Sequence, residues 1–162
     1  MEVKDKKTQD YSLLIVAGVF LGLGLGGFFD GILLHQILQW HHMLSSIRPA
    51  TTVSELELNM VGDGLFEAGT WLLTLVGVLL LWQAKRDNTP RSSRTFYGSI
   101  LVGAGTFNLV EGLIDHQILG IHHVKPGMNE LTWDVGFLVV GAILVVVGWL
   151  LIRTGKEAIA SS

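Results

Sequence analysis

Hydrophobic residues along the chain are gathered into four long runs separated by short polar segments. The runs cover residues 13–38, 65–82, 96–119 and 135–152. At about 1.5 Å of rise per residue, about 20 helical residues cross the ~30 Å hydrocarbon layer of a bilayer, so each run is long enough to span it once. The first run is too long for a secretory signal peptide and lacks a small-residue cleavage pattern. The pattern predicts an all-α integral membrane protein with four transmembrane helices in a bundle.

The composition and the distribution of positive charge extend this prediction. Hydrophobic residues make up 49% of the chain and charged residues 15%, as is typical of membrane proteins. Of the 11 Lys and Arg residues, only Arg48 and Lys125 lie in the first and third loops. By the positive-inside rule, both termini are then cytoplasmic, in the plasma or inner membrane. The other nine are Lys4, Lys6, Lys7, Lys85, Arg86, Arg91, Arg94, Arg153 and Lys156.

Two further features of the composition exclude classes of function. The chain has no cysteine, so neither disulfides nor thiolate metal ligands are available. Its net charge of −3 gives no basic surface of the kind that binds nucleic acid. We therefore expect lipid, and no nucleic acid, as its surroundings.

The second half of the chain repeats the pattern of the first. A shift of 71 residues superposes Asp63 on Asp134. Because each copy holds two runs, both have the same orientation, which predicts parallel repeats related by a pseudo-two-fold axis along the membrane normal. We expect one domain, 1–162, with repeat 1 at about 11–84, a cytoplasmic linker at 83–94 and repeat 2 at about 95–155. A shift of 81 residues superposes Asp30 on Glu111, Gly31 on Gly112, His35 on His116, His41 on His122 and His42 on His123.

A glycine pattern in the first run predicts close helix packing. Gly18, Gly22 and Gly26 recur every four residues and so share one face of a helix. Small residues at this spacing let two helix backbones approach closely inside a membrane. We expect a neighbouring helix to pack against this face.

Ionisable residues are costly inside a bilayer, and here they gather at the outer ends of the four runs. On one straight α-helix, Asp30 and His41 would lie ~16 Å apart, too far to share an ion whose ligands lie about 2.0 to 2.2 Å from it. We therefore expect the two copies to cooperate, with Asp30 opposite Glu111 and His35 opposite His116, unless the chain folds back after His35. The candidate metal ligands are His35, His116, Asp30, Glu111, His41, His42, His122, His123, Glu67, Asp63, Asp115 and Asp134.

Imidazoles and carboxylates without thiolates suit Fe, Mn, Zn or Cu(II). Each group alone has a simpler explanation, since histidine is at home at a membrane interface and acidic residues stabilise helix N-termini. The joint clustering on one side, with all six histidines in the duplicated segments, favours a metal site. We predict a membrane metalloprotein that holds one or two ions at the extracytoplasmic end of the bundle.

Several functions are compatible with such a site. Paired carboxylates and imidazoles in four-helix bundles favour redox or oxygen chemistry. Metal capture, delivery or transport is the second hypothesis, although the inner halves of the runs offer only Thr70, Thr74 and Ser99 as polar groups. A haem held by His35 and His116 is the third. Metal-assisted hydrolysis with Glu67 or Glu111 as base lacks a supporting nucleophile motif. A redox or metal-delivery partner on the outer side and a homo-oligomer fit these hypotheses, which leave open the metal and whether the protein is an enzyme.

The two histidine segments read FFDGILLHQILQWHHM at 28–43 and FNLVEGLIDHQILGIHHV at 107–124. With these motifs the chain resembles an uncharacterised prokaryotic family of small multi-pass membrane proteins of unknown function. The resemblance covers essentially all four runs. It implies a membrane location and assigns no activity.

Overall fold

Four long helices make up the fold. The computed structural model describes residues 10–160, with side chains as far as residue 155. Lys4, Lys6 and Lys7 therefore lie outside the described residues, and so does the side chain of Lys156. The helices are α1 (Ser12–Phe28), α2 (Val53–Arg86), α3 (Ser93–Glu111) and α4 (Glu130–Ala160), and α1 and α3 continue into the π-helices η1 (Phe29–Ile37) and η2 (Gly112–Ile118).

Each of the four helical segments is long and apolar enough to cross a membrane, which confirms the predicted all-α membrane fold. The segments are Ser12–Ile37, Val53–Arg86, Ser93–Ile118 and Glu130–Gly155. Helix α2 begins at Val53 instead of the predicted residue 65, because the Thr52 side chain accepts a hydrogen bond from the Glu55 backbone N–H and caps a polar first turn. The polar N-terminal part of α2 thus lies before its apolar run.

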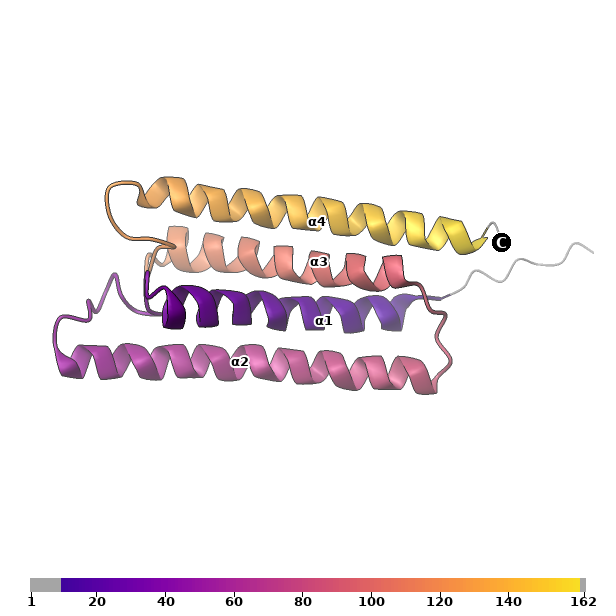
Figure 1. Cartoon of the computed structure of the whole chain (residues 1–162), viewed down its shortest axis with the longest axis horizontal. Helices are drawn as coiled ribbons and strands as arrows, with labels where there is room; N and C mark the ends of the chain where they lie inside the picture. Colours follow the sequence, from indigo (N-terminus) through magenta and orange to yellow (C-terminus); the bar gives the residue numbers. More distant parts are fainter. Residues whose placement is uncertain (1–9, 161–162) are drawn as a thin grey trace, which may run out of the picture.

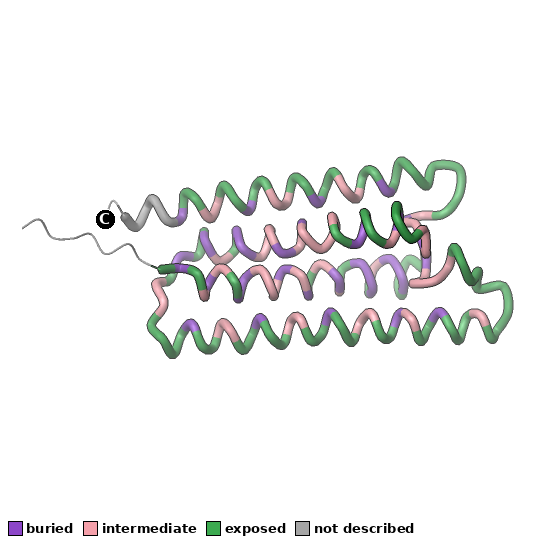
Figure 2. Tube along the Cα trace, turned by 180° about the vertical axis from the view of Figure 1, so that it is seen from behind, coloured by how far each residue is buried: buried purple, intermediate pink, exposed green. Residues whose placement is uncertain are grey.

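The helices lie side by side in the order α2, α1, α3, α4, and neighbours run antiparallel or, for α1 and α3, in the same direction (Figure 1). Among the described residues, α2 and α4 do not contact each other. Buried residues are concentrated on the two central helices, whereas α2 and α4 are largely exposed (Figure 2). In a bilayer this exposed apolar surface faces lipid.

The central helices meet at two glycines. A Cβ added to Gly22 would come within 2.8 Å of the Gly103 Cα, and one added to Gly103 would come equally close to the Gly22 Cα. Gly18 and Gly26 contact α3 through Ser99 and residues near Ala104. The expected packing face is confirmed, and its glycines are needed because a backbone occupies the space of a side chain.

Both central helices end in the same way, at the end of the bundle where η1 and η2 lie. The Leu38 N–H donates to the Leu33 carbonyl at 2.8 Å, and the Leu119 N–H donates to the Ile114 carbonyl at 2.8 Å, which is the wide i→i+5 pattern of a π-helix. The residue that follows each one, Gln39 or Gly120, has a left-handed backbone conformation, with φ of 49° and 56°. A left-handed residue stops a helix and reverses the chain direction.

Candidate metal centre

The reversal after η1 returns the chain to the helix it has just left. The His41 Nε2 lies 4.0 Å from an Asp30 carboxylate oxygen, and the His35 and His41 rings have centroids 4.4 Å apart. The ~16 Å separation expected from a straight helix was therefore wrong, because the π-helix and the turn at Gln39 fold the segment back on itself. The sequence left two arrangements open, a chain that folds back after His35 and residues from both halves that come together. Both occur in the structure.

Four imidazole rings form a single cluster between the central helices. The rings of His41 and His122 stack with centroids 4.7 Å apart and planes 6° apart. His116 lies 4.8 Å from His122, and His35 lies 5.9 Å from His122. All four residues are at most 2% exposed. The cluster therefore joins histidines from both halves of the chain in a site closed to bulk water.

The Nδ1 atoms of two of these rings face carboxylates on the outer helices. His35 Nδ1 lies 3.0 Å from Asp63 on α2, and His116 Nδ1 lies 3.5 Å from Asp134 on α4. Asp63 and Asp134 are each 1% exposed. Where Asp63 accepts from His35 Nδ1–H, the lone pair of a neutral His35 is left on Nε2, as in carboxylate–histidine–metal triads, whereas His116 Nδ1 has no hydrogen-bond partner.

The other two rings are fixed by backbone carbonyls from the opposite half of the chain. His41 Nδ1 donates to the Val124 carbonyl at 2.8 Å, and His122 Nδ1 donates to the Met43 carbonyl at 3.2 Å. Because a carbonyl oxygen only accepts, the hydrogen of His41 lies on Nδ1, whereas His122 faces acceptors on both sides, since its Nε2 also hydrogen-bonds to Glu111 at 3.0 Å. The Nε2 lone pair of His41 is then available to a ligand, and the two bonds to backbone carbonyls join the two halves of the chain.

The Nε2 atoms converge on two buried carboxylates. His35 Nε2 lies 3.1 Å from Asp30, and the Nε2 atoms of His116 and His122 lie 3.2 and 3.0 Å from Glu111. Ligands about 2.1 Å from one ion lie about 3 to 4.2 Å from each other, so these separations suit a metal. The buried atoms without a hydrogen-bond partner include both Asp30 oxygens, Glu111 Oε2 and the Nε2 atoms of His35, His41 and His116.

Within the described residues, two overlapping groups have ligand atoms that all lie within 4.8 Å of one another. One contains His35, His41 and His122, and the other contains Glu111, His116 and His122. Both groups are fully buried. The shared histidine makes them parts of one centre that can hold one ion or two.

His41 lies in the loop between η1 and α2, outside the membrane-spanning segments. Burial lowers the pKa of His41 to about 3, and the nearby His35 and His122 lower it further. Its imidazole is therefore neutral at physiological pH. A neutral imidazole is the form that binds metal.

Further hydrogen bonds hold the two carboxylates that face the imidazole rings. Asp63 also accepts from His42 Nδ1 at 2.7 Å and from the Met43 backbone N–H at 2.8 Å. In the same way, Asp134 accepts from His123 Nδ1 at 2.7 Å and from the Val124 N–H at 3.0 Å. The side chains of His42 and His123 are 18% and 24% exposed. These four candidates surround the imidazole cluster and hold its rings in place.

Two of the twelve candidates stay outside the cluster. Among the described residues, no hydrogen bond or ion pair joins the carboxylate of Glu67 or Asp115 to an imidazole. The Glu67 Oε1 is buried against the backbone of Gly31, without a hydrogen-bond partner. Asp63 and Glu111, each four residues away along the chain, turn toward histidines instead.

Sequence reasoning missed the groups that hold the two loops beside the histidine cluster. The Leu44 N–H donates to the buried Asn59 side chain at 3.0 Å, and that side chain donates to the Arg48 carbonyl at 2.7 Å. The Lys125 ammonium lies over the rings of Trp40 and Trp133, at 4.5 and 5.4 Å from their centroids. For the Asn59 contacts, the one available signal in the sequence was an asparagine inside a polar helix turn. No sequence signal marks which backbone carbonyls act as acceptors.

Comparison with known proteins gives one match. A family model described as "Predicted membrane protein (DUF2243)" matches residues 17–155. Searches of curated proteins and of solved structures find no match.

Proposed function

The chain belongs to the DUF2243 family of predicted membrane proteins, and from that premise we propose that it is a membrane metalloprotein with a redox or oxygen-related role. One or two transition-metal ions bind between the central helices at the end where η1 and η2 lie. The predicted orientation puts this end on the extracytoplasmic side of the plasma or inner membrane. The ligands are His35, His41, His116, His122, Asp30 and Glu111.

The observation that carries the proposal is the set of buried lone pairs that face one another. Nε2 atoms of four imidazoles and oxygens of two carboxylates converge, and the hydrogen bond from His41 Nδ1 to the Val124 carbonyl holds the hydrogen of that ring away from the centre. Buried acceptors that point at acceptors are unfavourable unless a cation or proton lies between them. A transition-metal ion supplies that charge and suits this ligand set.

Burial favours electron or small-molecule chemistry over passage of an ion through the membrane. The hydroxyls of Thr70, Thr74 and Ser99 donate to carbonyls of their own helices, so they offer no ligands to a moving ion. Below the cluster the central helices touch at Gly22 and Gly103. These features support a resident ion over a transported one.

Capture and delivery of a metal is a second candidate function. The partly exposed His42 and His123 lie between the cluster and the surface, each bonded to a carboxylate that also contacts the cluster. Such a pair suits transfer of an ion inward or outward. A delivery protein would lose its metal rapidly to a chelator, whereas a redox centre would retain it and change absorption on reduction.

The haem hypothesis is less compatible with the distances. The rings of His41 and His122 stack at 4.7 Å and contact both His35 and His116. A haem clamped by His35 and His116 would need the space that these two rings fill. A site crowded with carboxylates is also unlike the apolar pocket of a haem.

The experiment is elemental analysis and absorption spectroscopy of protein purified in detergent without chelators. We expect about one or two transition-metal ions per chain, retained during dialysis, and no Soret band. The His35→Ala/His116→Ala variant is expected to lose the metal. The matched His42→Ala/His123→Ala variant is expected to keep most of it, because these rings only support Asp63 and Asp134. Metal-free wild-type protein that folds normally would overturn the proposal.

A further inference from the structure

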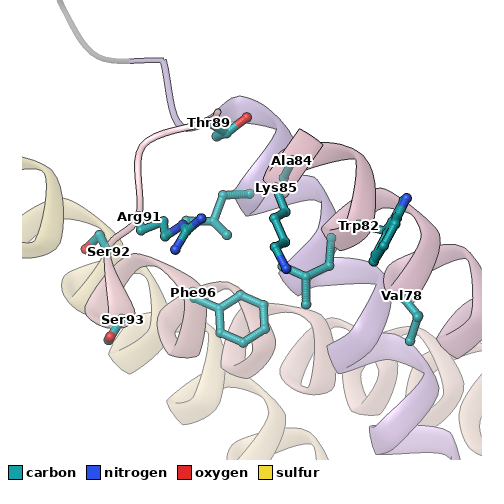
Figure 3. A pocket seen from close by; sticks show the side chains of 11 residues that line it. Val78, Trp82, Ala84, Lys85, Thr89, Arg91, Ser92, Ser93 and Phe96 are labelled. Carbon is teal, nitrogen blue, oxygen red and sulfur yellow. The ribbon is translucent and has the colours of Figure 1, made fainter. Parts of the chain in front are cut away.

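At the end of the molecule opposite the histidine cluster, a hollow of about 440 Å³ opens between α1, α2 and the start of α3. Its size falls within the about 300 to 1,000 Å³ of small-molecule sites. The hollow is lined by side chains from the last turns of α2, the loop that follows and the first turn of α3 (Figure 3). It has no residue in common with the metal centre.

The walls and the rim of the hollow differ in chemistry. Leu14, Leu81 and Phe96 belong to its apolar wall, whereas Lys85 and Arg91 supply positive charge. The Lys85 and Arg91 side chains both point into the space beside the Phe96 ring (Figure 3). Among the described residues, no acidic side chain lines the hollow. An ammonium and a guanidinium thus face an apolar cavity without a carboxylate to neutralise them.

The hollow lies where the hydrocarbon layer gives way to the headgroups. Helix α2 ends at Arg86 and α3 begins at Ser93, so the apolar spans end at this level. Ser93 lines the hollow, and the N-terminus of α3 adds the positive end of a helix dipole. Basic pockets between membrane helices at this depth suit anionic lipid headgroups.

We propose that this hollow binds one anionic phospholipid. Its phosphate lies between Lys85 and Arg91, and an acyl chain lies against Leu14, Leu81 and Phe96. Free phosphate would make no use of the apolar wall, and a lipid without net charge would leave the two cations unneutralised. The charge at the rim and the apolar wall together select an anion that carries a hydrocarbon chain.

The test is native mass spectrometry of the full chain released from micelles that contain equal amounts of phosphatidylglycerol and phosphatidylcholine. We expect wild-type protein to retain phosphatidylglycerol about thirtyfold more than phosphatidylcholine, since each cation at an anionic surface contributes about a factor of five. In Lys85→Gln/Arg91→Gln the two lipids should be retained almost equally. Equal retention by the wild-type protein would overturn the proposal.

Two controls separate this site from general electrostatics and from simple phosphate binding. The Arg86→Gln/Arg94→Gln variant removes the same charge from the same end, from residues that do not line the hollow, and should keep the preference. Leu81→Trp fills the apolar wall without changing the charge and should reduce lipid retention. Loss of the preference in the Arg86/Arg94 variant, or full displacement of the lipid by inorganic phosphate, would contradict a phospholipid site.

Discussion

The half-site built on α1 and α2 and the half-site built on α3 and α4 share several contacts but do not carry the same acidic residues. His35, Asp63 and the N–H of Met43 in one half correspond to His116, Asp134 and the N–H of Val124 in the other. The contacts that recur are those that orient imidazoles toward the centre. Shared contacts therefore identify the parts of each half that a common metal would need.

Two acidic residues, Glu67 and Asp115, occur in one half without an acidic counterpart in the other. Glu67 packs against Gly31, whereas Leu138 packs against Gly112 at the corresponding position. Asp115 corresponds in the same way to the buried Leu34. Because each acidic residue has an apolar counterpart, neither is required to complete a half-site.

The largest effect is expected where the halves touch. Gly22→Leu or Gly103→Leu would drive a side chain into the opposing backbone, which has no room to move aside. Each variant should lose more than about 3 kcal/mol of unfolding free energy, beyond ordinary overpacking. Gly69→Leu is the control, since nothing lies within 4 Å of a Cβ there. Denaturant unfolding in detergent measures the change, and stable Gly22→Leu protein would show that this crossing is not tight.

The second effect concerns the carboxylates behind the rings. Asp63→Asn and Asp134→Asn should each weaken metal binding by about 10- to 100-fold, because carboxylates behind histidine ligands orient the rings and raise their basicity. The loss should be greater for Asp63, which lies 3.0 Å from its histidine, than for Asp134 at 3.5 Å. Competition with a chromophoric chelator gives the affinities. Unchanged affinity in both variants would show that these two carboxylates do not support metal binding.

The third prediction concerns Glu67, which is replaced by the leucine found at the corresponding position of the second half. Glu67→Leu should retain the metal and gain about 1 to 3 kcal/mol of stability, because it removes a buried carboxylate oxygen that has no partner. Chemical unfolding and elemental analysis of the same preparation measure the two effects. Loss of metal would instead identify Glu67 as a ligand that the second half lacks.

The smallest effect lies at the turns that end η1 and η2. Gly120→Gln should destabilise the protein by about 1 kcal/mol, because a residue with a side chain is strained at positive φ. Gln39→Gly relieves the same strain but adds freedom to the unfolded chain, so its net change should be only a few tenths of a kcal/mol. Thermal unfolding compares them. A larger loss for Gln39→Gly would mean that the Gln39 side chain makes a contact essential to the turn.

The sequence predicted much of the fold, and ten of its twelve candidate ligands lie in or around the histidine cluster. Four apolar runs were enough to predict four spans, and the spacing of Gly18, Gly22 and Gly26 was enough to predict a helix contact. The return of His41 to Asp30 was not predictable from helical spacing, because η1 is a π-helix and Gln39 is left-handed without being glycine. Nor does any residue pattern reveal that the carbonyl of Val124 fixes a histidine from the other half.

The proposed function requires that both halves of the chain hold one shared metal centre. The most direct test is the metal content per chain of His35→Ala, of His116→Ala and of the variant that carries both substitutions. If the centre is shared, each single substitution lowers the metal content as far as the double substitution does. If each half binds metal independently, each single variant keeps about half of the wild-type metal and only the double variant loses all of it, which would contradict the account.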